Sequence, residues 1–134
     1  MKPVILSALL SLMIVLGGQA VAAPKRALPS ADRIAVYVMA DWCPNCKIIA
    51  PKWTKIQDQF RDKKILFITL DLSDKGRINQ AIMHAQALGI GPFLQQQGSG
   101  TGYIALLKAD TKQEITRFDR DTTEEEMIKA LSTP

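Results

Sequence analysis

Two cysteines, Cys43 and Cys46, are the only ones in the chain of 134 residues, and two residues separate them. Pro44 lies between them and suits the first position of a helix, because its missing N–H would have no partner there and its fixed φ already fits the helix. A helix that begins at Pro44 places Cys43 at the N-cap and Cys46 one turn further on. The two sulfur atoms would then be close enough to form a small disulfide ring, so the spacing predicts a pair of thiols that can be oxidised and reduced reversibly.

The predicted helix start makes the two thiols unequal. The unpaired N–H groups and the positive dipole at a helix N-terminus stabilise an anion at Cys43. A free cysteine has a pKa near ~8.5, and helix N-termini and CxxC contexts lower it to roughly 3.5 to 7.5. We therefore expect Cys43 to be the ionised nucleophile, and Cys46, deeper in the helix, to be the less accessible thiol that resolves a mixed disulfide.

A structural staple and a metal site are the other uses of such a pair. A bridge over two residues closes almost no loop, so it would stabilise the fold little by chain entropy. Two thiols without a third cysteine, and with nothing to place the single His84 near them, make a poor zinc site. We expect no resident cofactor or metal. The alternative to redox chemistry is a non-enzymatic module that binds a soft ion such as Cu(I), or a protein partner, through the same surface.

Residues 1–22 have the layout of a secretory signal peptide: a basic start, an apolar run over 4–16, and small residues before a predicted cleavage after Ala22. The apolar run is shorter than the ~20 residues that a membrane-spanning helix needs. An uncleaved N-terminal anchor is the alternative. Residues 23–33 read as a short lead-in, and 34–134 are enough for one domain. Either interpretation predicts an exported domain, periplasmic or secreted.

The formal net charge of +4 is spread along the chain. The basic residues form no patch with interleaved aromatic side chains, which argues against nucleic-acid binding. We expect an ordinary solvated surface and a monomer.

The elements that position the cysteines follow from the pattern of apolar residues. Runs rich in β-branched or aromatic residues predict strands, and apolar residues at helical spacing predict helices. The predicted strands are 34–39, 65–71, 103–107 and 114–118; the predicted helices are 44–60, 77–88 and one capped by Thr122 or Thr123. Residues 91–100 are predicted to be a loop. The order βαβαββα predicts an α/β domain with a four-stranded mixed sheet and helices on both faces, with the CxxC pair just after the first strand.

The segment 40–51 carries the most specific signal beyond the cysteines. Trp42 comes directly before the first cysteine, Lys47 follows the second, and Pro51 lies five residues further on inside the predicted helix. This segment is similar to the active-site segment of thioredoxins, and the resemblance to the thioredoxin-fold family extends over nearly all of 34–134. It implies the thioredoxin fold.

The resemblance also implies a thiol–disulfide oxidoreductase. Cys43 would attack a protein disulfide, and Cys46 would resolve the mixed disulfide. The protein would also need a redox partner that exchanges electrons with the cysteine pair, for which a membrane-bound protein is one candidate. Trp42 would be part of the docking surface, with a purely buried anchor as the alternative. The other residues expected to support the site are Asp41, Pro44, Asn45 and Lys47. Trp42 and Lys47 match the reducing members, which favours a reductant or isomerase of protein disulfides.

Two positions depart from the family pattern beneath the cysteines. Thioredoxins have a buried Asp where this chain has Tyr37, and a buried Lys where it has Phe67. Without these groups we expect a drier site, in which proton transfer uses water, Asp41 or Cys46 itself.

A third departure concerns the substrate loop. The family has a cis-proline before its third strand, usually preceded by Thr or Val, and this chain has Thr101 and Gly102 there. Glycine does not favour a cis bond as proline does. The resemblance assigns Thr101 and Gly102 to the substrate loop.

Overall fold

The computed structural model describes residues 30–134. The predicted signal peptide and most of the predicted lead-in lie outside the described residues. The elements, in chain order, are β1 (Arg33–Met39), α1 (Pro44–Gln59), β2 (Ile65–Asp71), α2 (Lys75–Ala87), α3 (Gly91–Gln97), β3 (Tyr103–Lys108), β4 (Glu114–Phe118) and α4 (Glu124–Ser132).

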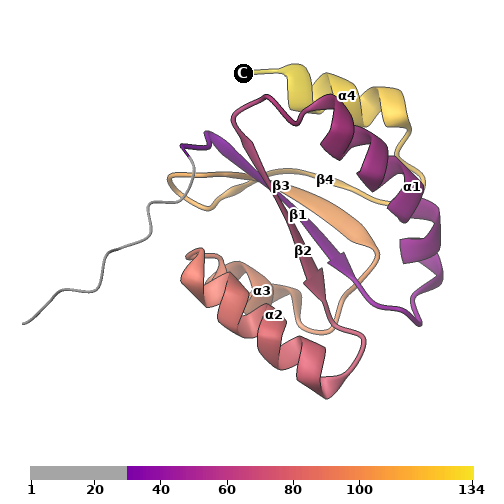
Figure 1. Ribbon diagram of the computed structural model, residues 1–134, viewed down its shortest axis with the longest axis vertical. Helices are drawn as coiled ribbons and strands as arrows, with labels where there is room; N and C mark the ends of the chain where they lie inside the picture. Colours follow the sequence, from indigo (N-terminus) through magenta and orange to yellow (C-terminus); the bar gives the residue numbers. More distant parts are fainter. Residues whose placement is uncertain (1–29) are drawn as a thin grey trace, which may run out of the picture.

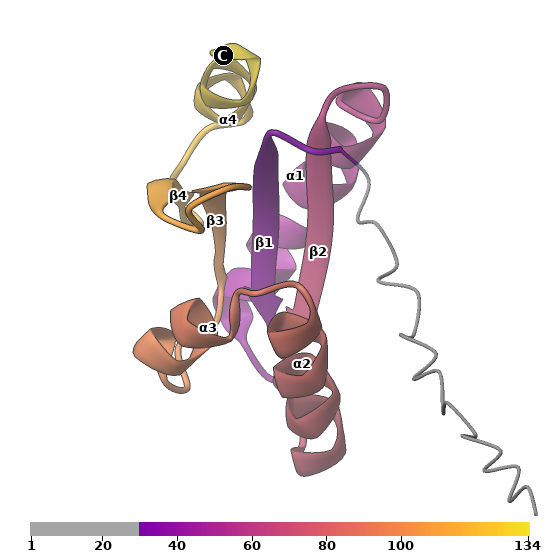
Figure 2. The ribbon, with the colours of Figure 1, turned by 90° about the vertical axis from the view of Figure 1, so that its left-hand side faces the viewer.

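The four strands form one mixed sheet in the order β2-β1-β3-β4. Strand β1 pairs with β2 in parallel and with β3 in antiparallel, and β3 and β4 form an antiparallel hairpin. Helices α1 and α4 cover one face, and α2 and α3 cover the other (Figures 1 and 2). The predicted mixed sheet with helices on both faces is confirmed.

Strand β1 is central because its sequence is apolar on both sides. Residues 34–38 are all buried, as expected for a strand with a helix layer on each face. The strand ends at Met39, and the chain turns from there into α1. The start of α1 therefore lies beyond the carboxyl end of the central strand.

Helix α1 buries a stripe formed by Ile49, Trp53, Ile56 and the following Phe60. Ile48, which the sequence pattern also assigns to the apolar face, is 48 % exposed, so that assignment is wrong. A residue adjacent to Ile49 is turned by about a quarter of the helix circumference away from the core. Within residues 30–134, no helix is long and apolar enough to cross a bilayer.

The segment 91–100 is not the predicted loop, because its first seven residues form α3. Pro92 lies in the first turn, where proline is tolerated, and the glutamines that follow are good helix formers. Phe93 and Leu94 bury α3 against the sheet. The order of elements is therefore βαβααββα, with one helix more than predicted.

The ends of the other two helices follow local rules. Asp74 caps α2 by accepting from the Arg77 N–H at 3.0 Å, so this helix starts two residues before the predicted Arg77. Gly89, at φ 73°, follows α2 in the left-handed region, where glycine commonly ends a helix. Thr123 caps α4 in a reciprocal capping box with Glu126, which confirms the second of the two predicted caps.

Candidate active site

Cys43 is the N-cap residue of α1, with φ −84° and ψ 115°. Its sulfur accepts from the Cys46 N–H at an N···S distance of 3.3 Å, and Pro44 occupies the first turn. The predicted helix start is confirmed. Both cysteines are free thiols.

The predicted difference in accessibility is not observed, because Cys43 and Cys46 are each only 3 % exposed. The two thiols differ in their hydrogen bonds instead. Burial opposes ionisation of Cys43, but hydrogen bonds from the Cys46 thiol, the Thr101 hydroxyl and the N–H groups of Cys46 and Asn45 outweigh it and lower the pKa of Cys43.

Burial raises the pKa of the Cys46 thiol, and its hydrogen bond to Cys43 and the charge of Cys43 raise it further. The backbone of Ala40 and the Tyr37 hydroxyl act in the opposite direction without reversing the shift. Cys43 therefore ionises before Cys46, and a neutral Cys46 thiol donates to the Cys43 thiolate. This is the asymmetry that a nucleophile and a resolving thiol need.

Thr101 and Gly102 lie directly beside Cys43. The Gly102 N–H donates to the Val38 carbonyl at 2.8 Å, and Gly102 has φ 85°. A Cβ at this position would lie 3.0 Å from the Cys43 sulfur and 2.7 Å from the Asn45 Cβ, so only glycine fits here without a shift. No peptide bond between residues 30 and 134 is cis. The loop that resembles the substrate loop therefore approaches the thiol through bare backbone.

Tyr37 occupies the space beneath Cys46 and was not identified as a site residue from sequence. Its hydroxyl donates to the Cys46 carbonyl at 2.9 Å. Its ring lies 5.4 Å from that of Trp53, which in turn lies 5.4 Å from Phe67. Burial raises the pKa of Tyr37 and the neighbouring Cys46 adds to the shift, so this hydroxyl stays neutral. The signal in the sequence is a lone hydroxyl in the otherwise apolar strand that ends at the CxxC loop.

Asp41 forms an ion pair with Arg77 at 2.5 Å, and the Asp41 N–H donates to the Ser73 Oγ at 2.8 Å. Arg77 is also 3.3 Å from Asp71. The Asp41 carboxylate is therefore held by α2, in a position that argues against its use as the proton acceptor for Cys46. Its contacts instead connect the CxxC loop to the turn between β2 and α2.

Trp42 is 61 % exposed, so the alternative interpretation as a buried anchor is wrong. Its indole N–H donates to the Ser73 carbonyl at 3.2 Å, which fixes the ring over the turn before α2. Asn45 is half-buried and its Oδ1 accepts from Arg120 at 3.5 Å, whereas Lys47 is exposed. Trp42 thus presents an aromatic surface next to the reactive thiol.

In the part of the chain that the structure describes, no three His, Cys, Asp or Glu side chains converge as a metal site would require. His84 is exposed on α2. The two cysteines are the thiol ligands that this site offers.

The chain is similar to several known proteins. A family model described as thioredoxin matches residues 21–86. The structure of Trxlp from Edwardsiella tarda EIB202 is similar at a TM-score of 0.52 and 20% identity, covering 78% of this chain and 86% of that chain. A thioredoxin from Fasciola hepatica gives a TM-score of 0.47 at 18% identity, covering 78% and 82%. Thioredoxin O2 from Arabidopsis thaliana, in the oxidized state, gives 0.46 at 13% identity, covering 76% of each chain. No curated protein sequence matches the chain.

Proposed function

Since this chain belongs to the thioredoxin-fold family, we propose that it is an exported thiol–disulfide oxidoreductase that reduces or isomerises disulfides in proteins. One observation supports the proposal most directly: hydrogen bonds lower the pKa of Cys43, whereas burial and the neighbouring Cys43 raise that of Cys46. A structural pair of cysteines would not need this asymmetry.

The reaction would proceed in two exchanges. The Cys43 thiolate attacks one sulfur of the substrate disulfide; the S–S bond breaks, a mixed disulfide forms and one substrate thiolate leaves. Cys46 then loses its proton and attacks the Cys43 sulfur, which forms the Cys43–Cys46 disulfide and releases the second substrate sulfur. That sulfur takes up the proton that Cys46 lost, so the substrate gains two electrons and the protein loses two.

The surroundings of Cys46 keep it from reacting until the first exchange is complete. Its raised pKa keeps the thiol protonated until the Cys43 charge is consumed in the mixed disulfide. The Tyr37 hydroxyl beside it is neutral and donates to the Cys46 carbonyl, so it fixes the backbone there and does not accept the proton. We therefore assign the proton transfer to water or to the leaving sulfur.

The proposed reducing role and the proposed export of the protein are supported by the sequence. Trp42 and Lys47 resemble the reducing family members, and residues 1–22 resemble a signal peptide. A reductant outside the cytosol needs a donor that restores its dithiol, for which a membrane protein is one candidate. A reduction potential near the ~−270 mV of thioredoxin would support a donor role, and a value near ~−120 mV would show an oxidant instead.

The test is the reduction of a protein disulfide by the full chain with dithiothreitol as the electron source. The unchanged protein should accelerate the reaction, and Cys43→Ser should abolish the acceleration. Cys46→Ser, reduced beforehand and separated from dithiothreitol, should accumulate a mixed disulfide at Cys43. Ile115→Gln, an exposed position on β4, is the matched control and should behave as the unchanged protein. Activity that survives Cys43→Ser would refute the assigned nucleophile. Tight 1:1 Cu(I) binding without disulfide exchange would favour the alternative binding module.

A further inference from the structure

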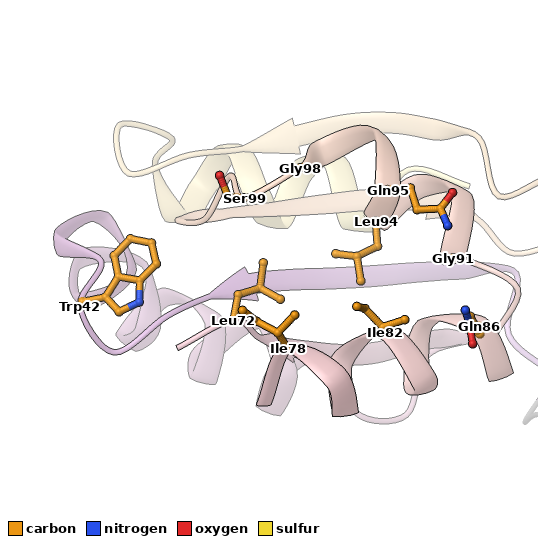
Figure 3. A pocket seen from close by; sticks show the side chains of 10 residues that line it. All are labelled: Trp42, Leu72, Ile78, Ile82, Gln86, Gly91, Leu94, Gln95, Gly98 and Ser99. Atoms are coloured by element: carbon orange, nitrogen blue, oxygen red, sulfur yellow. The ribbon is translucent and has the colours of Figure 1, made fainter. Parts of the chain in front are cut away.

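An apolar groove of about 370 Å³ runs between α2 and α3. Trp42 lies at one end, Gln86 and Gly91 lie at the other, and Ile78 and Ile82 line the α2 side (Figure 3). The groove exists because residues 91–97 form a helix that packs beside α2. A plain loop in this segment would not form its second side.

The exposed residues of the groove are unusual for a helix surface. Ile78 is 37 % exposed and Ile82 is 41 % exposed, and their i, i+4 spacing aligns them along α2. No charged side chain lines the groove; its polar members are the neutral Gln86, Gln95 and Ser99. A mostly apolar cleft of this volume is typical of a binding site, and its lack of charged side chains favours an uncharged ligand.

The groove is continuous with the redox site through Trp42. This residue precedes Cys43 directly, and its hydrogen bond to the Ser73 carbonyl fixes the indole at the end of the groove. The eight residue steps from Ile78 to Gln86 rise about 12 Å along the helix axis. This length corresponds to about four residues of extended chain. A polypeptide whose cysteine reaches Cys43 can therefore extend into the groove.

Building on the redox function proposed above, we propose that this groove binds an uncharged apolar segment of the polypeptide whose disulfide Cys43 attacks. The substrate class is then a disulfide flanked by apolar residues, as incompletely folded chains expose, and not the polar surface disulfide of a folded protein. Ile78 and Ile82 would determine this specificity without taking part in the exchange itself.

The test uses two peptides of equal length and charge, each with one cysteine joined by a disulfide to thionitrobenzoate. In one peptide Leu-Phe-Leu flanks the cysteine on both sides, and in the other Ser-Asn-Ser does. Attack by Cys43 on the peptide sulfur releases the coloured thionitrobenzoate and leaves the peptide in a mixed disulfide. We expect the apolar peptide to react about tenfold faster than the polar one.

Ile82→Gln and Ile78→Gln keep helix propensity at exposed positions and should each bring the rate of the apolar peptide close to that of the polar peptide. Met83→Gln is the matched control: it is the next residue on α2, is 70 % exposed and does not line the groove. It should leave the tenfold preference intact. All variants should react with the symmetrical thionitrobenzoate disulfide, which has no peptide, at the rate of the unchanged protein.

Calorimetric titration with the apolar peptide carrying serine in place of cysteine gives a readout independent of the thiols. Binding that is lost in Ile82→Gln and kept in Met83→Gln supports the proposal. Equal rates for the two peptides, with normal reaction of the symmetrical disulfide, would overturn the groove assignment and leave the redox function standing. Absence of reaction with every disulfide would overturn the redox function, and the groove assignment with it. A dimer that Ile82→Gln dissociates would show that a second copy occupies the groove, contrary to the proposal.

Discussion

Replacing Gly102 with alanine tests how closely the β3 loop approaches the reactive thiol. Gly102 has φ 85°, and a Cβ added there would lie 3.0 Å from the Cys43 sulfur and 2.7 Å from the Asn45 Cβ. Real Cβ atoms do not come that close to another carbon, so the loop or the start of α1 must move. The substitution therefore perturbs the site through one methyl group.

The magnitude has two parts. Alanine in the left-handed region costs about 1 to 2 kcal/mol, and forcing a methyl group into a packed site costs about 1 to 3 kcal/mol. We expect Gly102→Ala to lower the free energy of unfolding by about 2 to 5 kcal/mol in total. Gly98→Ala is the matched control, because Gly98 has φ 60° and nothing lies within 4 Å of its added Cβ. It should show the backbone cost alone.

The assay combines urea unfolding with the rate at which iodoacetamide alkylates Cys43, read by peptide mass. Any shift of the loop weakens the hydrogen bond from Thr101 that helps to lower the pKa of Cys43. Only the thiolate reacts, so at neutral pH the rate should fall by up to about tenfold for each unit by which the pKa rises. Gly98→Ala should alkylate at the original rate.

Equal stability of the Gly102→Ala and Gly98→Ala proteins would refute the close approach of residue 102 to the thiol. An unchanged alkylation rate in Gly102→Ala, together with a large loss of stability, would show that Thr101 does not contribute to ionisation of Cys43.

Three further predictions concern the thiols, Tyr37 and the N-terminus. The alkylation rate of Cys43 should reach half its maximum at a lower pH than that of Cys46, because hydrogen bonds that outweigh its burial lower the pKa of Cys43 and burial raises that of Cys46; the reverse order would contradict the assigned roles. Tyr37→Phe removes the donor to the buried Cys46 carbonyl and should cost about 1 to 3 kcal/mol in urea unfolding. It should also raise the pKa of Cys46 further, since the hydroxyl acts to lower it; an unchanged titration of Cys46 would count against the contact. In a bacterial host, the exported protein should begin at Ala23 by mass spectrometry, whereas an N-terminus that retains residues 1–22 would indicate an uncleaved anchor.

The local sequence is sufficient to predict a structural feature where that feature depends on a single helix end or a single strand. Pro44 after Cys43 specifies a helix start, and the apolar run 34–38 specifies a strand covered on both faces. The capping box of Thr123 and Glu126 specifies the start of α4 in the same way. These features depend on neighbours within one turn or one strand, so they can be predicted without knowledge of the fold.

The errors have a common cause in weak or competing local signals. The sequence pattern does not predict helix α3, because Gly91 and Pro92 at its start and the three glutamines that follow are typical of a loop. The helix is stabilised by the burial of Phe93 and Leu94. The apolar side chain of Ile48 favours the core, although its position on α1 turns it to solvent. In both cases packing against the sheet decided the outcome.

The CxxC pair follows from the sequence alone, as do the helix that begins between its cysteines and the strand that ends before it. The groups that surround the sulfur atoms depend on how the chain folds. Thr101 and Gly102, just before β3, approach Cys43, and Tyr37 of β1 donates to the Cys46 carbonyl. Helices α2 and α3 together form the groove beside Trp42. Hydrogen bonds, burial and close approach act over a few ångströms between residues far apart in the chain, so they arise only once the chain has folded.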